Sequence, residues 1–175
     1  MTPPRPQALS GARVTLVPAP QDVARAVSGH DHPALAVALA ALGLRPGRGW
    51  PHDDSADALR PLAEHGNAGH VGTFLVVLDG AVVGDCGWLG AADERGDVEI
   101  GYGLAAPCRG RGLGTELVDV LAAWAGRQAG VRRVTAEVLV GNEPSRRLLG
   151  RLGFTEEPGT PPYLRYVRSV PPLRP

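Results

Sequence analysis

A glycine-rich stretch in the second half of the chain has the residue types and spacing of an anion-binding loop. Glycines let the main chain approach an anion closely, and the first turn of a helix offers unpaired N–H groups at the positive end of its dipole. The stretch lies between a predicted strand and a predicted amphipathic helix, so we expect it to hold a phosphate group. The candidate contacts are Arg109, Gly110, Arg111, Gly112, Leu113, Gly114 and Thr115.

Dinucleotide binding and RNA binding by this stretch have weaker support. It lacks the third glycine of the GxGxxG dinucleotide fingerprint, and GxxxxGK[ST] occurs nowhere in the chain. An Arg-Gly repeat could indicate RNA binding, but 18 basic and 18 acidic residues leave no net charge, and a helix follows at once. An ordinary glycine-rich turn before a helix remains the plain alternative.

The predicted strand 97–104 places a carboxylate, Glu99, near this loop. Side chains alternate between the two faces of a strand, so Glu99 shares its face with Asp97, Gly101 and Gly103. The other face carries Val98, Ile100, Tyr102 and Leu104. Glu99 could therefore act in an open space that leads to the loop, or be a solvent-facing carboxylate only. A β-bulge in this strand would change the assignment.

Hydrophobic periodicity and turn residues give the elements around these residues. We expect strands at 13–17, 73–78, 81–89, 97–104, 134–140 and 163–168, and helices at 21–28, 33–42, 55–65, 113–126 and after Asn142. Residues 43–54 have no periodicity and form a long loop, a kind of segment that often lines sites. Strands 97–104 and 134–140 flank a helix, so they should be parallel.

Composition favours a single domain, residues 1–175, with short proline-rich ends at 1–10 and 170–175. Zero net charge and the lack of a long apolar run or signal peptide favour a cytoplasmic protein with neither a nucleic-acid nor a membrane partner. Cys86 and Cys108 belong to no metal or redox motif and are expected to be free thiols. The five histidines have no metal-site spacing, so no metal is expected.

Taken together, these motifs resemble the GNAT superfamily of acyl-CoA-dependent N-acyltransferases. Residues 109–114 match its Arg/Gln-x-x-Gly-x-Gly/Ala motif, and the segment from Asn142 to Gly153-Phe154 matches its second motif. The sequence of residues 98–102, Val-Glu-Ile-Gly-Tyr, is similar to that found in the branch of ribosomal-protein-alanine N-acetyltransferases. The resemblance implies an α/β (α+β) GNAT fold. This is a mixed, mostly antiparallel sheet of six to seven strands with helices on both faces and a V-shaped splay between the strand ending near 104 and the strand 134–140.

The resemblance also implies an activity, transfer of an acetyl group from acetyl-CoA to a primary amine by direct attack. The loop would bind the diphosphate of coenzyme A, and main-chain groups near Leu104 and Ala105 would contact the pantetheine arm and the acyl carbonyl. Asn142 and Ser145 would lie beside the arm. Glu99 matches the position of a general base in many members.

One position departs from the family pattern. Many members place a tyrosine that protonates the leaving thiolate where this chain has Leu149. Tyr163, Tyr166 or a water could supply the proton, or the thiolate could leave with little help. A GNAT-fold module that binds acyl-CoA as a sensor or scaffold without turnover is therefore the alternative function. The acceptor, a protein N-terminus or a small-molecule amine, stays open, as does the oligomeric state, for which dimers are common in this branch.

Overall fold

A computed structural model of the chain describes residues 7–66 and 72–170. Most of the two proline-rich ends, together with His70, lies outside these ranges. Within them, none of the helices is both long and apolar enough to span a bilayer.

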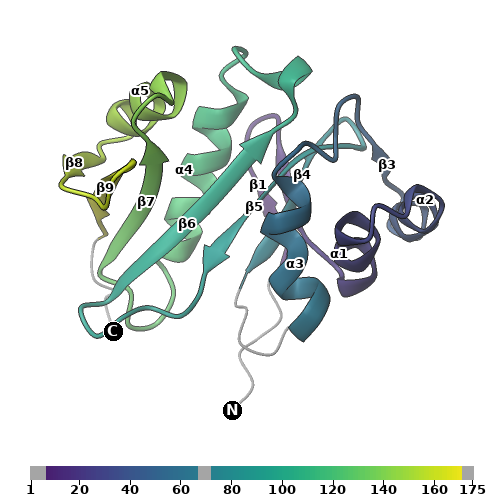
Figure 1. Ribbon diagram of the computed structural model, residues 1–175, viewed down its shortest axis with the longest axis horizontal. Coiled ribbons are helices and arrows are strands. Elements are labelled where there is room, and N and C mark those ends of the chain that lie inside the picture. Colours follow the sequence, from purple (N-terminus) through teal and green to yellow (C-terminus); the bar gives the residue numbers. More distant parts are fainter. Residues whose placement is uncertain (1–6, 67–71, 171–175) are drawn as a thin grey trace.

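The described residues form one mixed sheet with helices on both faces (Figure 1). The strands are β1 (Leu9–Ser10), β2 (Thr15–Pro18), β3 (Arg45–Pro46), β4 (Thr73–Leu78), β5 (Ala81–Leu89), β6 (Asp97–Leu104), β7 (Arg133–Leu139), β8 (Thr155–Glu157) and β9 (Tyr163–Ser169). The helices are α1 (Gln21–Ser28), α2 (His32–Ala40), α3 (Ser55–His65), the 3₁₀ turn η1 (Ala106–Cys108), α4 (Leu113–Ala125) and α5 (Glu143–Arg151).

The sheet has the order β1-β2-β4-β5-β6-β7-β9-β8, with β3 paired to β5. Neighbouring strands are antiparallel except for the pairs β6/β7 and β3/β5. This confirms the predicted mixed, mostly antiparallel sheet. Three short strands, β1, β3 and β8, add to the six or seven expected, because two or three residues are too few to show an alternating pattern.

Two hydrophobic layers cover the sheet. Figure 1 shows α3 in front of the sheet and α4 behind it. Behind the sheet, α4 buries Leu113, Leu117 and Leu121 against β5, β6 and β7. In front, α1, α2 and α3 form a second core around Leu59 and Leu75. The front helices therefore cover only the first half of the sheet.

Strands β6 and β7 pair at one end only. Their register comprises Asp97 with Arg133, Val98 with Val134 and Glu99 with Thr135. Beyond these pairs β6 continues to Leu104 and β7 to Leu139 without pairing to each other. The predicted V-shaped splay is confirmed, and its open end lies next to the glycine-rich loop.

A buried carboxylate holds the closed end of the V. Asp97 is 6% exposed and accepts hydrogen bonds from Nε of Arg133 at 2.6 Å and from its Nη2 at 2.5 Å. Arg165 of β9 donates to the same carboxylate at 2.5 Å. The hydrogen bond from Arg133 is the main reason that the pKa of Asp97 is lowered. One carboxylate thus joins three neighbouring strands.

Replacing this carboxylate tests its contribution to stability. Asp97→Asn should lower the free energy of unfolding at pH 7 by about 2–3 kcal/mol, because two arginines lose a charged partner. The lowered pKa means that the contribution is complete above the unfolded pKa of about 3.9 and is lost as the pH falls through the folded pKa. Urea unfolding at pH 7, 5 and 3 should therefore show a gap between wild type and variant that is constant down to about pH 5 and shrinks below about pH 4.

A matched control is Glu157→Gln, because the Glu157 carboxylate is 3.7 Å from Arg133 and its side chain is 42% exposed. This change should alter the free energy of unfolding by about 0.5 kcal/mol or less. A gap for Asp97→Asn that stayed the same at pH 3 would show that the charge of Asp97 does not hold the strands.

Candidate functional site

The glycine-rich loop has the geometry of an uncapped helix start. Gly110 and Gly112 have φ of 74° and 77°, in the left-handed region that favours glycine. Gly112 is the N-cap of α4, and no side chain in the described part of the chain caps the first turn of this helix. The N–H groups of that turn are therefore available to an anion outside the helix.

The two arginines of the loop have different surroundings. Nε of Arg109 donates to the carbonyl of Leu104 at 2.8 Å, which ties the loop to the end of β6. Arg111 is exposed, and its one hydrogen bond within residues 7–66 and 72–170 is accepted by its backbone carbonyl, from Nη1 of Arg13 at 3.0 Å. Arg111 is thus the loop cation with a side chain open to a ligand.

Arg13 adds a positive charge to the loop that sequence analysis missed. Its Nε pairs with Glu116 at 3.0 Å, and Glu116 also accepts from the backbone N–H groups of Arg13 and Val14. Burial alone would raise the pKa of Glu116, but these hydrogen bonds together outweigh it, so the pKa is lowered. The contact joins residues 103 positions apart, so no local pattern in the sequence indicates it.

The open end of the V exposes an edge of β6. The N–H of Ala105 donates to the carbonyl of Val83 on the β5 side at 2.8 Å. Because alternate residues of a strand direct their amide groups to opposite sides, the amides of Tyr102 and Leu104 face the side from which β7 has diverged. The faces are as predicted, because the β5/β6 register is continuous and β6 contains no bulge.

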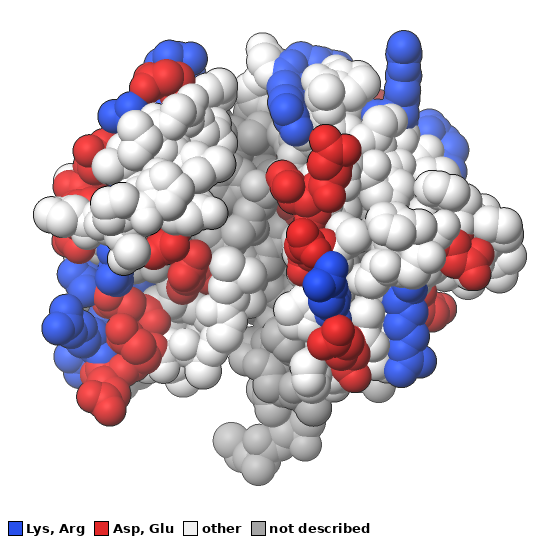
Figure 2. Space-filling view, viewed as in Figure 1, with Lys and Arg blue, Asp and Glu red and all other residues white. Residues whose placement is uncertain are grey.

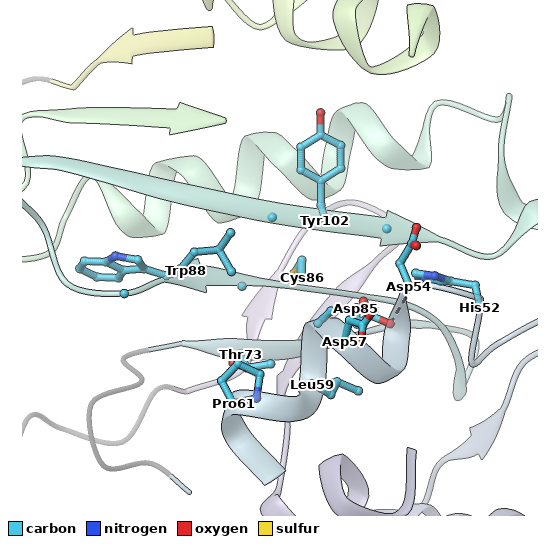
Figure 3. A pocket seen from close by; sticks show the side chains of 16 residues that line it. His52, Asp54, Asp57, Leu59, Pro61, Thr73, Asp85, Cys86, Trp88 and Tyr102 are labelled. Carbon is cyan, nitrogen blue, oxygen red and sulfur yellow. Dashed lines mark ion pairs between the residues drawn. The ribbon is translucent and has the colours of Figure 1, made fainter. Parts of the chain in front are cut away.

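The hydroxyl of Tyr102 is also on the β7 side of the sheet. It is buried and forms no hydrogen bond with any described residue. Burial raises the pKa of Tyr102, and the nearby Ser145 hydroxyl at the start of α5 works in the opposite direction. Figure 3 shows the ring pointing away from α3.

A cavity of about 460 Å³ opens on the opposite face of β5 and β6, against α3 (Figure 3). Its strand wall includes Gly87, Gly101 and Gly103, and the His52 ring packs against the last of these glycines. Asp54 and Asp57 line the helix side. Figure 2 shows acidic side chains beside the central cleft. The cavity therefore has glycines in its strand wall and acidic side chains in its helix wall.

A buried polar cluster forms the inner end of this cavity. Asp85 of β5 is 3% exposed and accepts hydrogen bonds from Nε1 of Trp50 at 2.8 Å and from the hydroxyl of Ser55 at 2.5 Å. Nε2 of His52 lies 3.4 Å from the same carboxylate. The predicted loop 43–54 thus does line the cavity. Sequence analysis did not single out Asp85. The signal that could have indicated it is a carboxylate in the otherwise apolar segment 81–89.

Comparison with known proteins identifies the family. A model described as "Acetyltransferase (GNAT) domain" matches residues 13–155. The chain belongs to the GNAT family of acetyltransferases. It is also 32% identical over 135 residues to "Uncharacterized N-acetyltransferase YjdG" of Bacillus subtilis, covering 74% of this chain and 78% of that protein. It is an acyl-CoA-dependent acetyltransferase, as the motifs predicted.

Solved structures confirm the fold of this acetyltransferase. RimJ of Mycobacterium smegmatis, in complex with CoA-disulfide, has a TM-score of 0.66 at 24% identity, over 97% of this chain and 90% of that one. The ribosomal-protein-S5-alanine acetyltransferase of Vibrio fischeri has a TM-score of 0.66 at 18% identity, over 96% and 99%.

The second GNAT motif forms the start of α5. Oδ1 of Asn142 accepts from the N–H of Ser145 at 3.3 Å, so Asn142 caps the helix. Its amide nitrogen is not used in this bond and can still contact a ligand. Leu149 is fully buried in the core behind the sheet. The position at which many GNAT members carry a catalytic tyrosine therefore has a packing role here.

Glu99 and Tyr163, the predicted catalytic residues, are separated by a strand. Glu99 is half-buried on β6, and burial, with a smaller contribution from Glu137, raises its pKa. Tyr163 is exposed at the start of β9, and β7 lies between β9 and β6. The other candidate, Tyr166, is buried and its hydroxyl donates to Glu156 at 2.6 Å.

The two cysteines are free and buried, as expected. Burial is the main reason that the pKa of Cys86 is raised, with a contribution from the neighbouring Asp85. Its side chain belongs to the core behind the sheet, and a buried thiol with a raised pKa is a poor nucleophile.

The polar cluster should contribute to stability as well as to the cavity. Asp85→Ala leaves the Trp50 and Ser55 donors buried without an acceptor, so the free energy of unfolding should fall by about 2–4 kcal/mol. Denaturant unfolding measures this loss. The matched control is Asp57→Ala in the same cavity wall, where the carboxylate is exposed and the expected change is about 0.5 kcal/mol or less. Equal effects of the two changes would mean that Asp85 does not hold residues 50–55.

Proposed function

We propose that this GNAT protein transfers an acetyl group from acetyl-CoA to a primary amine by direct attack of the amine on the thioester. The separation of β6 from β7 just before the glycine-rich loop carries the proposal. An extended thiol arm needs a gap bordered by free backbone groups, and its diphosphate needs donors at one end of that gap. The open V and the uncapped start of α4 supply these two features together.

In this arrangement the first turn of α4 and the loop 109–115 hold the diphosphate, with Arg111 adding charge. Asn142 and Ser145 lie at the start of α5 beside the arm. The amide of Leu104 is the better oxyanion donor, because the N–H of Ala105 is already bonded to β5. Losing one such donor typically lowers the rate about 10²–10³-fold.

The acceptor approaches from the cavity on the other face of β6. Its acidic wall, Asp54 and Asp57, attracts a protonated amine. At pH 7 an α-amino group with a pKa near 8 is about one-tenth free base, whereas a lysine is about one in 10³ to 10⁴. A protein N-terminus or another amine of low pKa is therefore the favoured substrate. Two solved neighbours, described as a ribosomal L7/L12 alpha-N-protein acetyltransferase and a ribosomal-protein-S5-alanine acetyltransferase, support this choice.

Proton transfer completes the reaction. Glu99 is the general base that the family resemblance suggests, and Tyr163 is the suggested acid. Tyr102 is a further source of a proton for the thiolate, because β6 borders the gap whereas β9 is one strand beyond β7. Its raised pKa keeps the hydroxyl protonated at neutral pH.

The second candidate function is an acyl-CoA sensor or scaffold without turnover. The observation that favours it is Leu149, which is packed in the core where many members carry an acid. Both functions require coenzyme A to bind at the loop, so they differ in turnover alone.

An amine panel distinguishes the two functions. Purified protein is mixed with acetyl-CoA and peptides of varied N-terminus, polyamines, aminoglycosides or small amines, and free CoA thiol is followed with time. We expect thiol release that depends on the amine, fastest with amines of low pKa. Tight binding of CoA without release for any amine would instead support the sensor.

Charge reversal in the loop tests the coenzyme site. Arg111→Glu should weaken CoA binding at least about tenfold, because a carboxylate would replace a cation beside the diphosphate. The fold should be unaffected, since the side chain is exposed. Calorimetry with CoA measures the change. Arg127→Glu, exposed just beyond the other end of α4, is the matched control and should leave affinity unchanged. Equal affinity in both variants would place the diphosphate elsewhere.

A further inference from the structure

His52 packs directly on the main chain of β6 beside the proposed reaction centre. A Cβ added at Gly103 would lie 2.5 Å from Nε2 of His52 and 2.6 Å from its Cε1. The imidazole thus occupies the place of a side chain at Gly103, one residue before Leu104. It belongs to the wall of the cavity through which the acceptor enters (Figure 3).

The cluster around Asp85 fixes the position of this imidazole. The backbone N–H of His52 donates to the Ser55 hydroxyl at 3.1 Å, and that hydroxyl donates to Asp85. Trp50 donates to the same carboxylate. Two hydrogen bonds from residues 50–55 therefore end on one carboxylate of β5, a third ties the His52 backbone to Ser55, and the His52 ring is held between that carboxylate and β6.

The imidazole has proton-accepting capacity that its neighbours do not use. Its side chain is 10% exposed, and Nε2 is buried without a hydrogen-bond partner among the described residues, 3.4 Å from Asp85. Catalytic hydrogen bonds are often this long before substrate binds. With the Nε2–H directed at Asp85, Nδ1 is the nitrogen left to accept a proton, as in other pairs of a base with an orienting carboxylate.

We propose that His52, oriented by Asp85, is the general base that deprotonates the acceptor amine. This inference rests on the proposed acetyl transfer. An ammonium group of the acceptor gives one proton to Nδ1, and the free amine attacks the thioester carbon. The C–N bond forms and the C–S bond breaks. The second proton of the nitrogen passes to the departing thiolate, giving the amide and CoA-SH, and the imidazolium returns its proton to solvent.

Position favours His52 over Glu99 for this role. Glu99 pairs with Thr135 at the closed end of the V and does not line the cavity. Five residues of strand separate it from Leu104, which is about 16 Å at 3.3 Å per residue. His52 lies against Gly103, the residue next to Leu104. Imidazole also changes charge between about pH 5 and 8, which suits a base that works near neutrality.

Two acceptors of similar size and different basicity test the assignment. The simplest pair is ethylamine and 2,2,2-trifluoroethylamine, where fluorine makes the amine largely unprotonated at neutral pH; if another amine of the panel is faster, that amine and its fluorinated analogue are used. In His52→Gln, kcat with the basic amine should fall about 10²–10⁴-fold, and with the fluorinated amine less than about tenfold. Asp85→Asn should show the same pattern more weakly, since its amide oxygen still accepts from Trp50 and Ser55. A merely structural role would lower both rates alike.

Three controls make the outcome decisive. Calorimetry should show unchanged CoA affinity in both variants, which also shows that they are folded. His32→Gln, the same change at an exposed histidine of α2, should have wild-type rates. Glu99→Gln should lose less than about tenfold with the basic amine. The proposal would be overturned if Glu99→Gln lost a large part of kcat with the basic amine and His52→Gln lost little. It would also be overturned if His52→Gln lost kcat equally with both acceptors. Failure of the proposed function would be distinct, because wild type would then release no thiol.

Discussion

The fixed end of the β6/β7 pair is the constraint on which the rest of the site depends. Asp97 binds Arg133 and Arg165 and so holds three strands together at one edge. From there β7 diverges, and the amides of Tyr102 and Leu104 face a gap instead of a neighbouring strand. Unpaired backbone donors in a protein interior are unfavourable unless a partner satisfies them. A ligand with carbonyl groups along an extended arm is a suitable partner, so the splay is useful only if something binds in it.

In the proposed reaction the two substrates meet at β6 from opposite faces of the sheet. Behind β6, the gap and the start of α4 suit the donor. In front, the His52 imidazole lies against Gly103 and the Leu89 side chain lies beside Gly101, so these two side chains border the path to the strand. This front wall depends on residues 50–55, which Asp85 ties to β5 through Trp50 and Ser55. The proposed donor side is therefore built mainly by the consecutive elements β6, η1 and α4, to which Arg13 and the start of α5 add contacts. The acceptor side is assembled from distant segments.

That difference explains what could be predicted from sequence. The faces of β6, the neighbouring strands 73–78 and 81–89 and the helix that starts at the glycine-rich loop are local patterns, and the structure has all three as predicted. Asp79 and Gly80 both have positive φ, which a tight hairpin requires. The contacts of Arg13 with Glu116 and of His52 with Asp85 join residues far apart in the chain. Hydrophobic periodicity, which is a local pattern, cannot indicate such contacts. Very short strands such as β3 were not predicted because two residues are too few to show an alternating pattern.

The buried Leu149 fits a site in which the acceptor side has the harder proton transfer. A thiolate with a pKa near 8.5 is a good leaving group at neutral pH, so loss of a tyrosine from α5 has a small effect on that step. An amine that arrives protonated must lose a proton before it can attack. The titratable side chains lie where the proposed reaction needs this proton transfer. Asp54, Asp57, His52 and Asp85 all line the cavity proposed for the acceptor. On the proposed donor side, the buried Tyr102 hydroxyl and the Ser145 hydroxyl at the start of α5 are neutral groups.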